Sequence, residues 1–138
     1  MRSLSSLLSV AVLAALLAGC GAGSAGSADD FRNGDEKAVA QVVDDLSQAA
    51  RDRDGREVCT SLLAKEAVAK LQDGTRDCAA VMQDQLSDAS PNYVVDVQDV
   101  TVTGDTATAK VESPVFGEQR TQTLRFVREG QAWRLAGS

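Results

Sequence analysis

The sequence contains no histidine. Histidine is the commonest general base in enzymes, the commonest metal ligand and the usual side chain for sensing pH near neutrality. Its absence removes the most frequent basis for acid–base catalysis and for a metal centre. From the residues alone we therefore expect no metal site and no cofactor.

The chain is also short of positive charge. It has 14 basic and 20 acidic residues, and Arg2 is the one basic residue among the first nineteen. Without those nineteen residues, 13 basic and 20 acidic side chains give a net charge of −7. Such a chain has no electrostatic footprint for nucleic acid and is not drawn to an anionic membrane surface. We expect no nucleic-acid partner.

A long apolar run that could cross a membrane is missing as well. Residues 4–17 are mostly apolar, but this run is too short and too rich in small residues to span a bilayer. Placed after Arg2, it has the character of the apolar region of an export signal. The run ends in Leu-Ala-Gly-Cys at residues 17–20, which resembles the lipobox of bacterial lipoproteins.

The lipobox resemblance implies that Cys20 receives a diacylglycerol thioether and that the chain is cut before it. The protein would then be held at the extracytoplasmic face of the cell membrane through the lipid on Cys20, and two or three acyl chains make such attachment lasting. The alternative is an ordinary secretory signal that leaves Cys20 as a free thiol. The expected organisation is a signal peptide (1–19), the lipidated cysteine with a flexible tether (20–34), and one domain (35–138).

Helical periodicity predicts three helices at the start of this domain. Two capping-box pairs, Asn33 with Glu36 and Asp54 with Glu57, mark the starts of the first two helices. Thr75 is the expected start of the third. The three segments are residues 33–51, 54–72 and 75–89.

The rest of the chain alternates with period two, which predicts antiparallel strands. Gly104-Asp105 has the composition of a two-residue hairpin loop. The apolar parity flips at residues 98–99, which predicts a β-bulge in the first strand. The expected pairs are Val102 with Ala107, Val100 with Ala109, and Val97 with Val111.

A second hairpin is predicted around Glu129-Gly130. Pairing outward from this loop gives one apolar face and one face on which two arginines oppose each other. The like-charge pair would need solvent or a carboxylate such as Glu112. The expected pairs are Phe126 with Trp133, Leu124 with Leu135, and Arg125 with Arg134.

Three helices followed by a bent antiparallel sheet resembles the nuclear transport factor 2-like superfamily, which includes ketosteroid isomerase and SnoaL-type polyketide cyclases. The resemblance covers about residues 35–136 and rests on element order, two cysteines and the closing pattern of residues 126–135. It implies an α+β fold in which N-terminal helices pack on a curved antiparallel sheet. Such a cone-like domain has room for an apolar pocket at its wide end.

Cys59 and Cys78 are the even pair that remains if Cys20 is lipidated. In an oxidising compartment, on inward faces of neighbouring helices, they are expected to form a disulfide. The alternative is two buried reduced thiols. Their spacing is far from the Cys-x-x-Cys of a redox-active pair.

Three aromatic residues are candidates for the pocket or its mouth: Tyr93, Phe116 and Trp133. For Phe116 the alternative is a loop aromatic that folds onto its own core. Enzymes of the superfamily place active-site groups on the first strand, where this chain has Asp96 and Asp99. We interpret both as solvated strand carboxylates and assign no catalytic residue.

Residues 52–55 contain a fragment of a calcium-loop pattern, but the further acidic ligands that a complete loop needs do not fall in place. Turn and cap chemistry explains this segment better.

The expected inward side chains carry no ionisable group, which favours a non-enzymatic binding or accessory domain. The alternatives are a small enzyme acting on a hydrophobic substrate and a protein-interaction module of a cell-envelope complex. The partner would be a hydrophobic small molecule or a cell-envelope protein, and the pattern specifies no oligomeric state. The expected inward positions are Val39, Val42, Val43, Leu46, Leu62, Leu63, Val81, Met82, Val97, Val100, Val102, Ala107, Ala109, Leu124, Phe126, Trp133 and Leu135.

Overall fold

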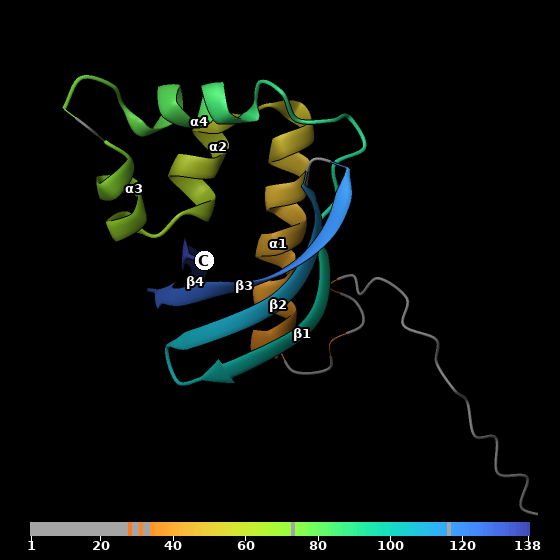
Figure 1. Cartoon of the computed structure of the whole chain (residues 1–138). Helices are drawn as coiled ribbons and strands as arrows, with labels where there is room; N and C mark the ends of the chain where they lie inside the picture. The colour runs from red at the N-terminus through yellow and green to blue at the C-terminus, as the bar shows by residue number, and fades with distance from the viewer. Residues whose placement is uncertain (1–27, 29–30, 32–33, 73, 116) are drawn as a thin grey trace, which may run out of the picture.

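The computed structural model describes residues 28, 31, 34–72, 74–115 and 117–138 and shows an α+β domain (Figure 1). Helices come first and strands second, and one antiparallel sheet with the order β1-β2-β3-β4 curves around the long first helix. The expected fold class is confirmed. The helical elements are α1 (Gly34–Asp52), α2 (Gly55–Glu57), the π-helical turn η2 (Val58–Leu62), α3 (Lys65–Leu71) and α4 (Cys78–Leu86). The strands are β1 (Asp96–Thr103), β2 (Thr106–Val115), β3 (Glu118–Glu129) and β4 (Ala132–Gly137).

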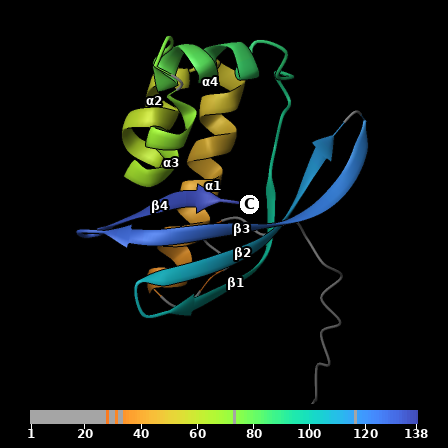
Figure 2. The same cartoon turned by 60° about the vertical axis from the view of Figure 1, so that its left-hand side comes forward.

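Helix α1 lies across the concave face of the sheet, as Figure 2 shows. Its apolar side chains recur at helical spacing, so they form one stripe that packs against the strands, and Val39 and Val43 are fully buried. The solvent-exposed side of α1 carries hydrogen-bonded polar pairs such as Gln41 with Asp45. The expected cap residue Asn33 lies outside the described residues.

The end of α1 is set by a left-handed residue that is not glycine. Arg53 has a φ of 55°. The N–H of Arg53 donates to the carbonyl of Ala50 at 3.2 Å, and the N–H of Asp54 donates to that of Ala49 at 2.9 Å. These two bonds form a Schellman motif, which satisfies carbonyls that the last turn of a helix leaves unpaired.

The second expected helix is not continuous, so that prediction is wrong. Asp54 caps its start as expected, because its Oδ1 accepts from the N–H of Glu57 at 2.9 Å. Leu63 then adopts an extended conformation, with φ −85° and ψ 144°. The N–H of Ala64 donates to the carbonyl of Leu135 at 2.8 Å, so a tertiary bond to β4 replaces a helical one. Helix α3 is therefore a separate helix that begins at Lys65.

The third helix begins later than expected, at Cys78 instead of Thr75. The cap is Asp77, whose Oδ1 accepts from the N–H of Ala80 at 2.8 Å. Threonine and aspartate both favour N-cap positions. Asp77 is the cap because it lies one residue before α4, where its side-chain oxygen faces an N–H that has no partner within the helix.

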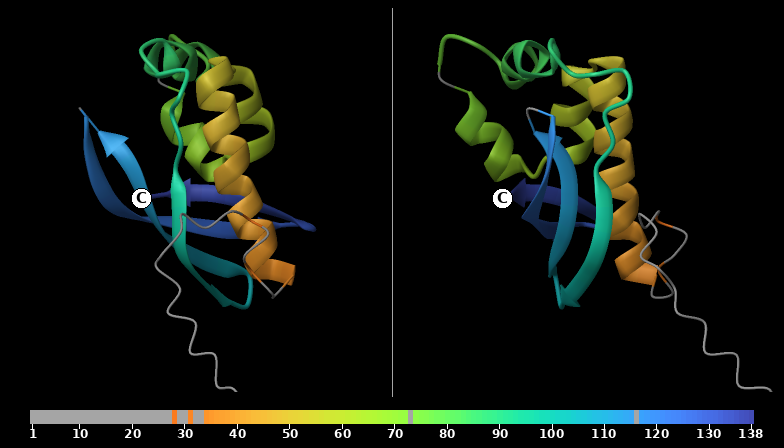
Figure 3. Two further views of the ribbon diagram at one scale, coloured as in Figure 1. Left: turned by 90° about the vertical axis from the view of Figure 1, so that its right-hand side faces the viewer. Right: turned by 45° about the vertical axis from the view of Figure 1, so that its right-hand side comes forward.

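The first predicted hairpin is confirmed. All three expected pairs are present, and the register shifts between Val97 and Asp99, where the β-bulge was placed. A bulge bends its strand and increases the local twist. The sheet curves strongly, and the far end of the β2–β3 hairpin turns up toward the helical layer (Figure 3).

The register of the last hairpin differs from the expectation by one residue along each strand. Glu129 opposes Ala132, so the loop is Gly130-Gln131 instead of Glu129-Gly130. Gly130 has a φ of 64°, a left-handed conformation that glycine adopts without steric cost. A shift of one residue on both strands keeps every side chain on its expected face. The observed pairs are Arg128 with Trp133, Val127 with Arg134, Phe126 with Leu135, and Arg125 with Gly137.

This register shows that two predicted pairs are wrong. Arg125 does not oppose Arg134, so no carboxylate is needed between them, and Leu124 does not oppose Leu135. The core nevertheless forms from the expected side chains, because the faces are unchanged. All the expected inward positions except Val81 belong to the buried cluster or pack against it. Within the described part of the chain, no helix is long and apolar enough to cross a membrane.

Candidate functional site

An open pocket of about 810 Å³ lies between the helical layer and the concave face of the sheet. Its walls come from α1, α4, the connector of residues 87–95 and the inner faces of β2 and β3. Figure 3 shows this connector running down beside α1 into β1. The apolar lining side chains are Leu46, Ala50, Val58, Met82, Leu86, Ala89, Val95, Val111, Pro114, Leu124 and Leu135. The other lining residues are Gln85, Asp88, Ser90, Asn92, Tyr93, Ser113, Gly117 and Gln122.

The connector wall is fixed to α1 by hydrogen bonds. The hydroxyl of Ser47 is buried; it donates to the carbonyl of Val43 at 3.1 Å and accepts from the N–H of Val95 at 3.0 Å. The guanidinium of Arg51 donates to the carbonyl of Tyr93 at 2.8 Å. These bonds hold Tyr93 and Val95 at the pocket, where both are lining residues; a role of Tyr93 in ligand binding stays a prediction.

The helical wall is held by the disulfide between Cys59 and Cys78, which is present as predicted. It joins η2 to α4 across a Cα–Cα distance of 6.1 Å. Gly55 packs against α4 so closely that a Cβ there would lie 2.6 Å from the backbone nitrogen of Gln83 and 2.8 Å from the carbonyl oxygen of Ala79. Cys78 is the one buried residue of α4, and Met82 and Leu86 are partly buried against the core.

Two polar side chains interrupt the apolar sheet wall. Ser113 on β2 is 4% exposed, and Gln122 on β3 donates from its amide Nε2 to the Ser113 hydroxyl oxygen at 3.1 Å. Both continue the inner-face alternation, beyond Val111 on one strand and Leu124 on the other. Neither residue was among the expected site residues. Their parity with the neighbouring core positions was the signal that could have found them.

Among the described lining residues, Asp88 is the one carboxylate, and its side chain is in an exposed position. Asp96 and Asp99 do not line the pocket, and Asp99 is exposed. In the described part of the chain, no hydrogen bond joins Asp88 to Tyr93, and no second carboxylate lines the pocket beside them. The described part of the pocket therefore contains no pair of ionisable groups within hydrogen-bond reach.

Trp133 lies at the opposite end of the sheet from this pocket and is not one of its lining residues. Its indole Nε1 donates to Oδ1 of Asp35 at 3.4 Å, and the Arg128 guanidinium lies 4.5 Å from its ring centroid. Arg128 also forms ion pairs with Asp35 at 2.9 Å and with Asp105 at 3.3 Å. The hydrogen bond from Arg128 is the main reason that the pKa of Asp35 lies below its ordinary value.

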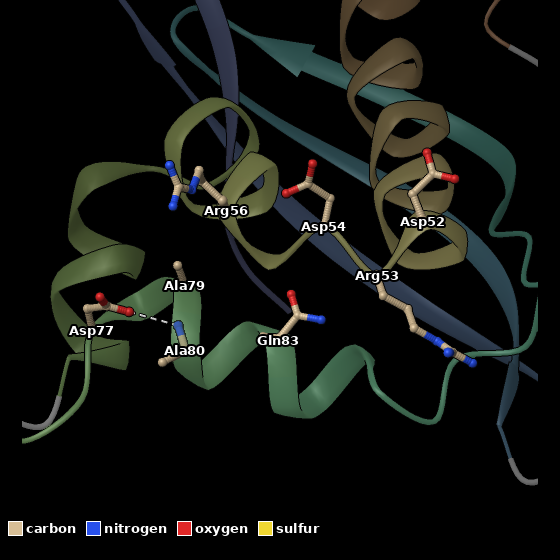
Figure 4. Close-up of a pocket in the computed structure, with 8 residues that line it drawn as sticks. All are labelled: Asp52, Arg53, Asp54, Arg56, Asp77, Ala79, Ala80 and Gln83. Carbon is tan, nitrogen blue, oxygen red and sulfur yellow. Dashed lines mark hydrogen bonds between the residues drawn. The ribbon is translucent and has the colours of Figure 1, made fainter.

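A second, shallower hollow of about 520 Å³ lies where the end of α1 meets α2 and α4. Figure 4 shows the three carboxylates among its lining residues, Asp52, Asp54 and Asp77, with Arg53 turned away from the other labelled side chains. Asp54 and Asp77 serve as helix caps. In the described part of the chain, no group of three or more acidic or cysteine side chains is arranged to hold a metal ion. Cap and turn chemistry accounts for this segment.

Cys20 and Phe116 lie outside the described residues. The lipidation site and the expected role of Phe116 at the pocket mouth therefore stay predictions.

No known protein-family profile matches the chain, and no curated protein matches it. Among solved structures, the chain is similar to the "De novo designed NTF2 fold protein NT-9". The two are 17% identical, the match covers 82% of this chain and 86% of that one, and the TM-score is 0.45.

Proposed function

We propose that this chain is a lipid-anchored extracytoplasmic lipoprotein whose nuclear transport factor 2-like domain binds a hydrophobic small molecule without turning it over. The anchor rests on the lipobox at residues 17–20 and on the signal-like run before it. The superfamily assignment rests on helices followed by a curved antiparallel sheet with a pocket on its concave side. The binding role rests on the chemistry of that pocket.

The pocket is the observation that carries this proposal. Small-molecule sites are typically apolar clefts of roughly 300–1,000 Å³ with a few convergent polar groups. The volume of about 810 Å³ and the mostly apolar lining fit that description. Catalysis in such a cone needs an ionisable group in a desolvated setting beside a second polar group. Asp88 is instead exposed, which supports binding without turnover.

The two rival roles have less support. An enzyme would have to use Tyr93 and Asp88, which line the same pocket without a hydrogen bond between them. A protein-interaction module would be expected to present an exposed apolar patch. Among the described residues, Val94, at 43% exposure, is the one large apolar side chain that is exposed.

Binding is tested with N-phenyl-1-naphthylamine, a neutral fluorophore whose emission rises in apolar surroundings. The variant Leu86→Trp adds bulk to the α4 wall of the pocket, and we expect it to weaken probe binding by about tenfold or more. The matched control is Val94→Trp, which places the same side chain at an exposed position outside the lining. Equal probe binding by both variants, or none by the wild type, would contradict the proposed pocket.

The anchor is tested separately by phase partitioning. Cys20→Ala removes the one cysteine at the proposed cleavage site, so we expect the variant to leave the detergent phase that retains the wild type. The control is Cys59→Ser with Cys78→Ser, which leaves Cys20 in place. Detergent-phase partitioning by Cys20→Ala equal to that of the wild type would show that the lipoprotein assignment is wrong.

A further inference from the structure

The polar pair on the sheet wall has hydrogen-bonding capacity that the protein does not use. The Ser113 hydroxyl oxygen accepts from Gln122, but no hydrogen bond donated by the Ser113 hydroxyl is present among the described residues. The side chain is 4% exposed and lines the pocket, so bulk water is largely excluded from it. Every buried side-chain nitrogen or oxygen of the described residues has at least one partner, and for the Ser113 oxygen that partner is Gln122. The hydroxyl hydrogen is the part of the group that a ligand or water in the pocket can still accept.

The surroundings of this hydroxyl indicate what could bind to it. Val111 and Leu124 follow Ser113 and Gln122 along the same face, so an apolar body resting on them would bring a polar head to the pair. A hydroxyl that accepts a hydrogen bond becomes a stronger donor, because hydrogen bonds in a chain polarise one another. The Ser113 hydroxyl is therefore suited to donate to a carbonyl oxygen of a ligand that lies next to the Gln122 amide.

The charges around the pocket disfavour one class of head group. None of the described lining residues is lysine or arginine, and Asp88 adds negative charge at the rim. Arg120 opposes Ser113 in the strand register, but it is not a lining residue, and its guanidinium lies 3.5 Å from the Glu118 carboxylate. A carboxylate or phosphate head would thus enter the pocket without a cation to pair with it.

We infer that Ser113 and Gln122 are the specificity-determining pair for a neutral carbonyl compound, such as a ketone, ester or amide carried on an apolar body. This inference rests on the proposed function and adds the chemical class of the ligand to it. Ser113 donates to the carbonyl oxygen, Gln122 orients the hydroxyl, and the apolar wall selects the body. Anionic amphiphiles, fatty acids included, are disfavoured.

Three naphthalene fluorophores test the inference on the full chain, with any detergent held below its critical micelle concentration so that micelles do not take up the probes. One is the neutral ketone 6-propionyl-2-(dimethylamino)naphthalene, the second is N-phenyl-1-naphthylamine, which has no carbonyl, and the third is the anionic 1-anilinonaphthalene-8-sulfonate. We expect Ser113→Ala to weaken binding of the ketone by about fivefold to tenfold, the effect of one hydrogen bond. Binding of N-phenyl-1-naphthylamine should change by less than about twofold. The sulfonate should bind least tightly of the three.

Two further variants keep the outcome interpretable. Gln122→Leu removes the orienting amide from an exposed position and is expected to weaken the ketone alone, which provides a second test if Ser113→Ala is poorly folded. Thr121→Ala, on the outer face of β3 next to Gln122, is the matched control and should leave all three affinities unchanged.

The failures are distinguishable. If the wild type binds neither neutral probe, the proposed function itself is wrong. If both neutral probes bind and neither Ser113→Ala nor Gln122→Leu affects the ketone selectively, the pocket stands and the assignment of the polar pair is overturned. Sulfonate binding as tight as that of the ketone would overturn the preference for a neutral head group.

Discussion

The two ends of the curved sheet are built in different ways. At the closed end, Arg128 stacks on Trp133 and pairs with Asp35 and Asp105, so helix α1, the β1–β2 loop and the last hairpin are joined by one network. At the open end, apolar side chains of the sheet line the pocket. The hydrogen-bonded polar pair Ser113 and Gln122 lies next to them in the same wall.

The comparison shows where this small domain obtains its rigidity. The closed end uses the chain's one tryptophan, which is 4% exposed, and the charges that pair around it. The open end uses a short helix in which Cys78 is the one buried residue, and the disulfide joins that helix to η2. A pocket wall that cannot be filled with side chains needs another means of support, and the disulfide provides it.

The largest effect is expected from breaking the closed end. Trp133 is 4% exposed, and Trp133→Ala should lower the free energy of unfolding by about 3–5 kcal/mol through lost burial and the cavity left behind. Denaturant unfolding followed by circular dichroism measures the loss. Trp133→Phe keeps most of the volume and removes the Nε1 donor, so its loss should be clearly smaller. Equal losses would mean that packing contributes little at this end.

Breaking the open end should have a smaller and more local effect. Cys59→Ser with Cys78→Ser removes a cross-link over a sequence separation of 19 residues, which corresponds to about 3 kcal/mol. Because Trp133 is the one tryptophan, its fluorescence reports the closed end alone, while N-phenyl-1-naphthylamine reports the pocket. We expect unchanged tryptophan emission at 25 °C together with about tenfold weaker probe binding. A change in both signals together would show that the two ends are not independent.

The charge network at the closed end makes a pH-dependent contribution. The Arg128 hydrogen bond lowers the pKa of Asp35 below 3.8, so its stabilising effect is present above that value and is lost as the pH falls through the lowered folded-state pKa. Asp35→Asn should flatten the acid limb of a plot of melting temperature against pH. Asp45→Asn, on the exposed side of the same helix, is the control for loss of charge. An unaltered acid limb in Asp35→Asn would contradict the role of this carboxylate.

The sequence predicted the sheet better than it predicted the helices. The first hairpin was placed correctly because its glycine-containing loop and its apolar parity agree on one register. In the last hairpin, loops at Glu129-Gly130 and at Gly130-Gln131 give the same faces, so alternation alone cannot choose between them. The break at Leu63 has no glycine or proline signal, because a hydrogen bond from Ala64 to β4 causes it.

The site was predictable in part for the same reason. The disulfide and Tyr93 follow from the identities of single residues. The structure contains the bond between Cys59 and Cys78, and Tyr93 is one of the residues that line the pocket. Trp133 was also expected at the pocket. Its position depends on Asp35 in α1 and on Arg128 in the neighbouring strand β3, and the residues around Trp133 in the sequence do not indicate either contact. Serine and glutamine are common on strand surfaces, so Ser113 becomes notable only when the curved sheet buries it.

The smallest expected effect concerns the helix end that adjoins the open end of the domain. Arg53 holds a φ of 55°, a conformation in which any Cβ is disfavoured and glycine is not. Arg53→Gly should therefore raise the free energy of unfolding by about 0.5–1 kcal/mol, because the Schellman bonds of Ala49 and Ala50 do not use the arginine side chain. Arg53→Val, with a β-branched side chain at the same φ, should lower it. Thermal melts of the two variants give the sign. If glycine fails to stabilise, the Arg53 side chain makes a contribution of its own to the joint between α1 and α2, and the open end would then be supported by more than its disulfide.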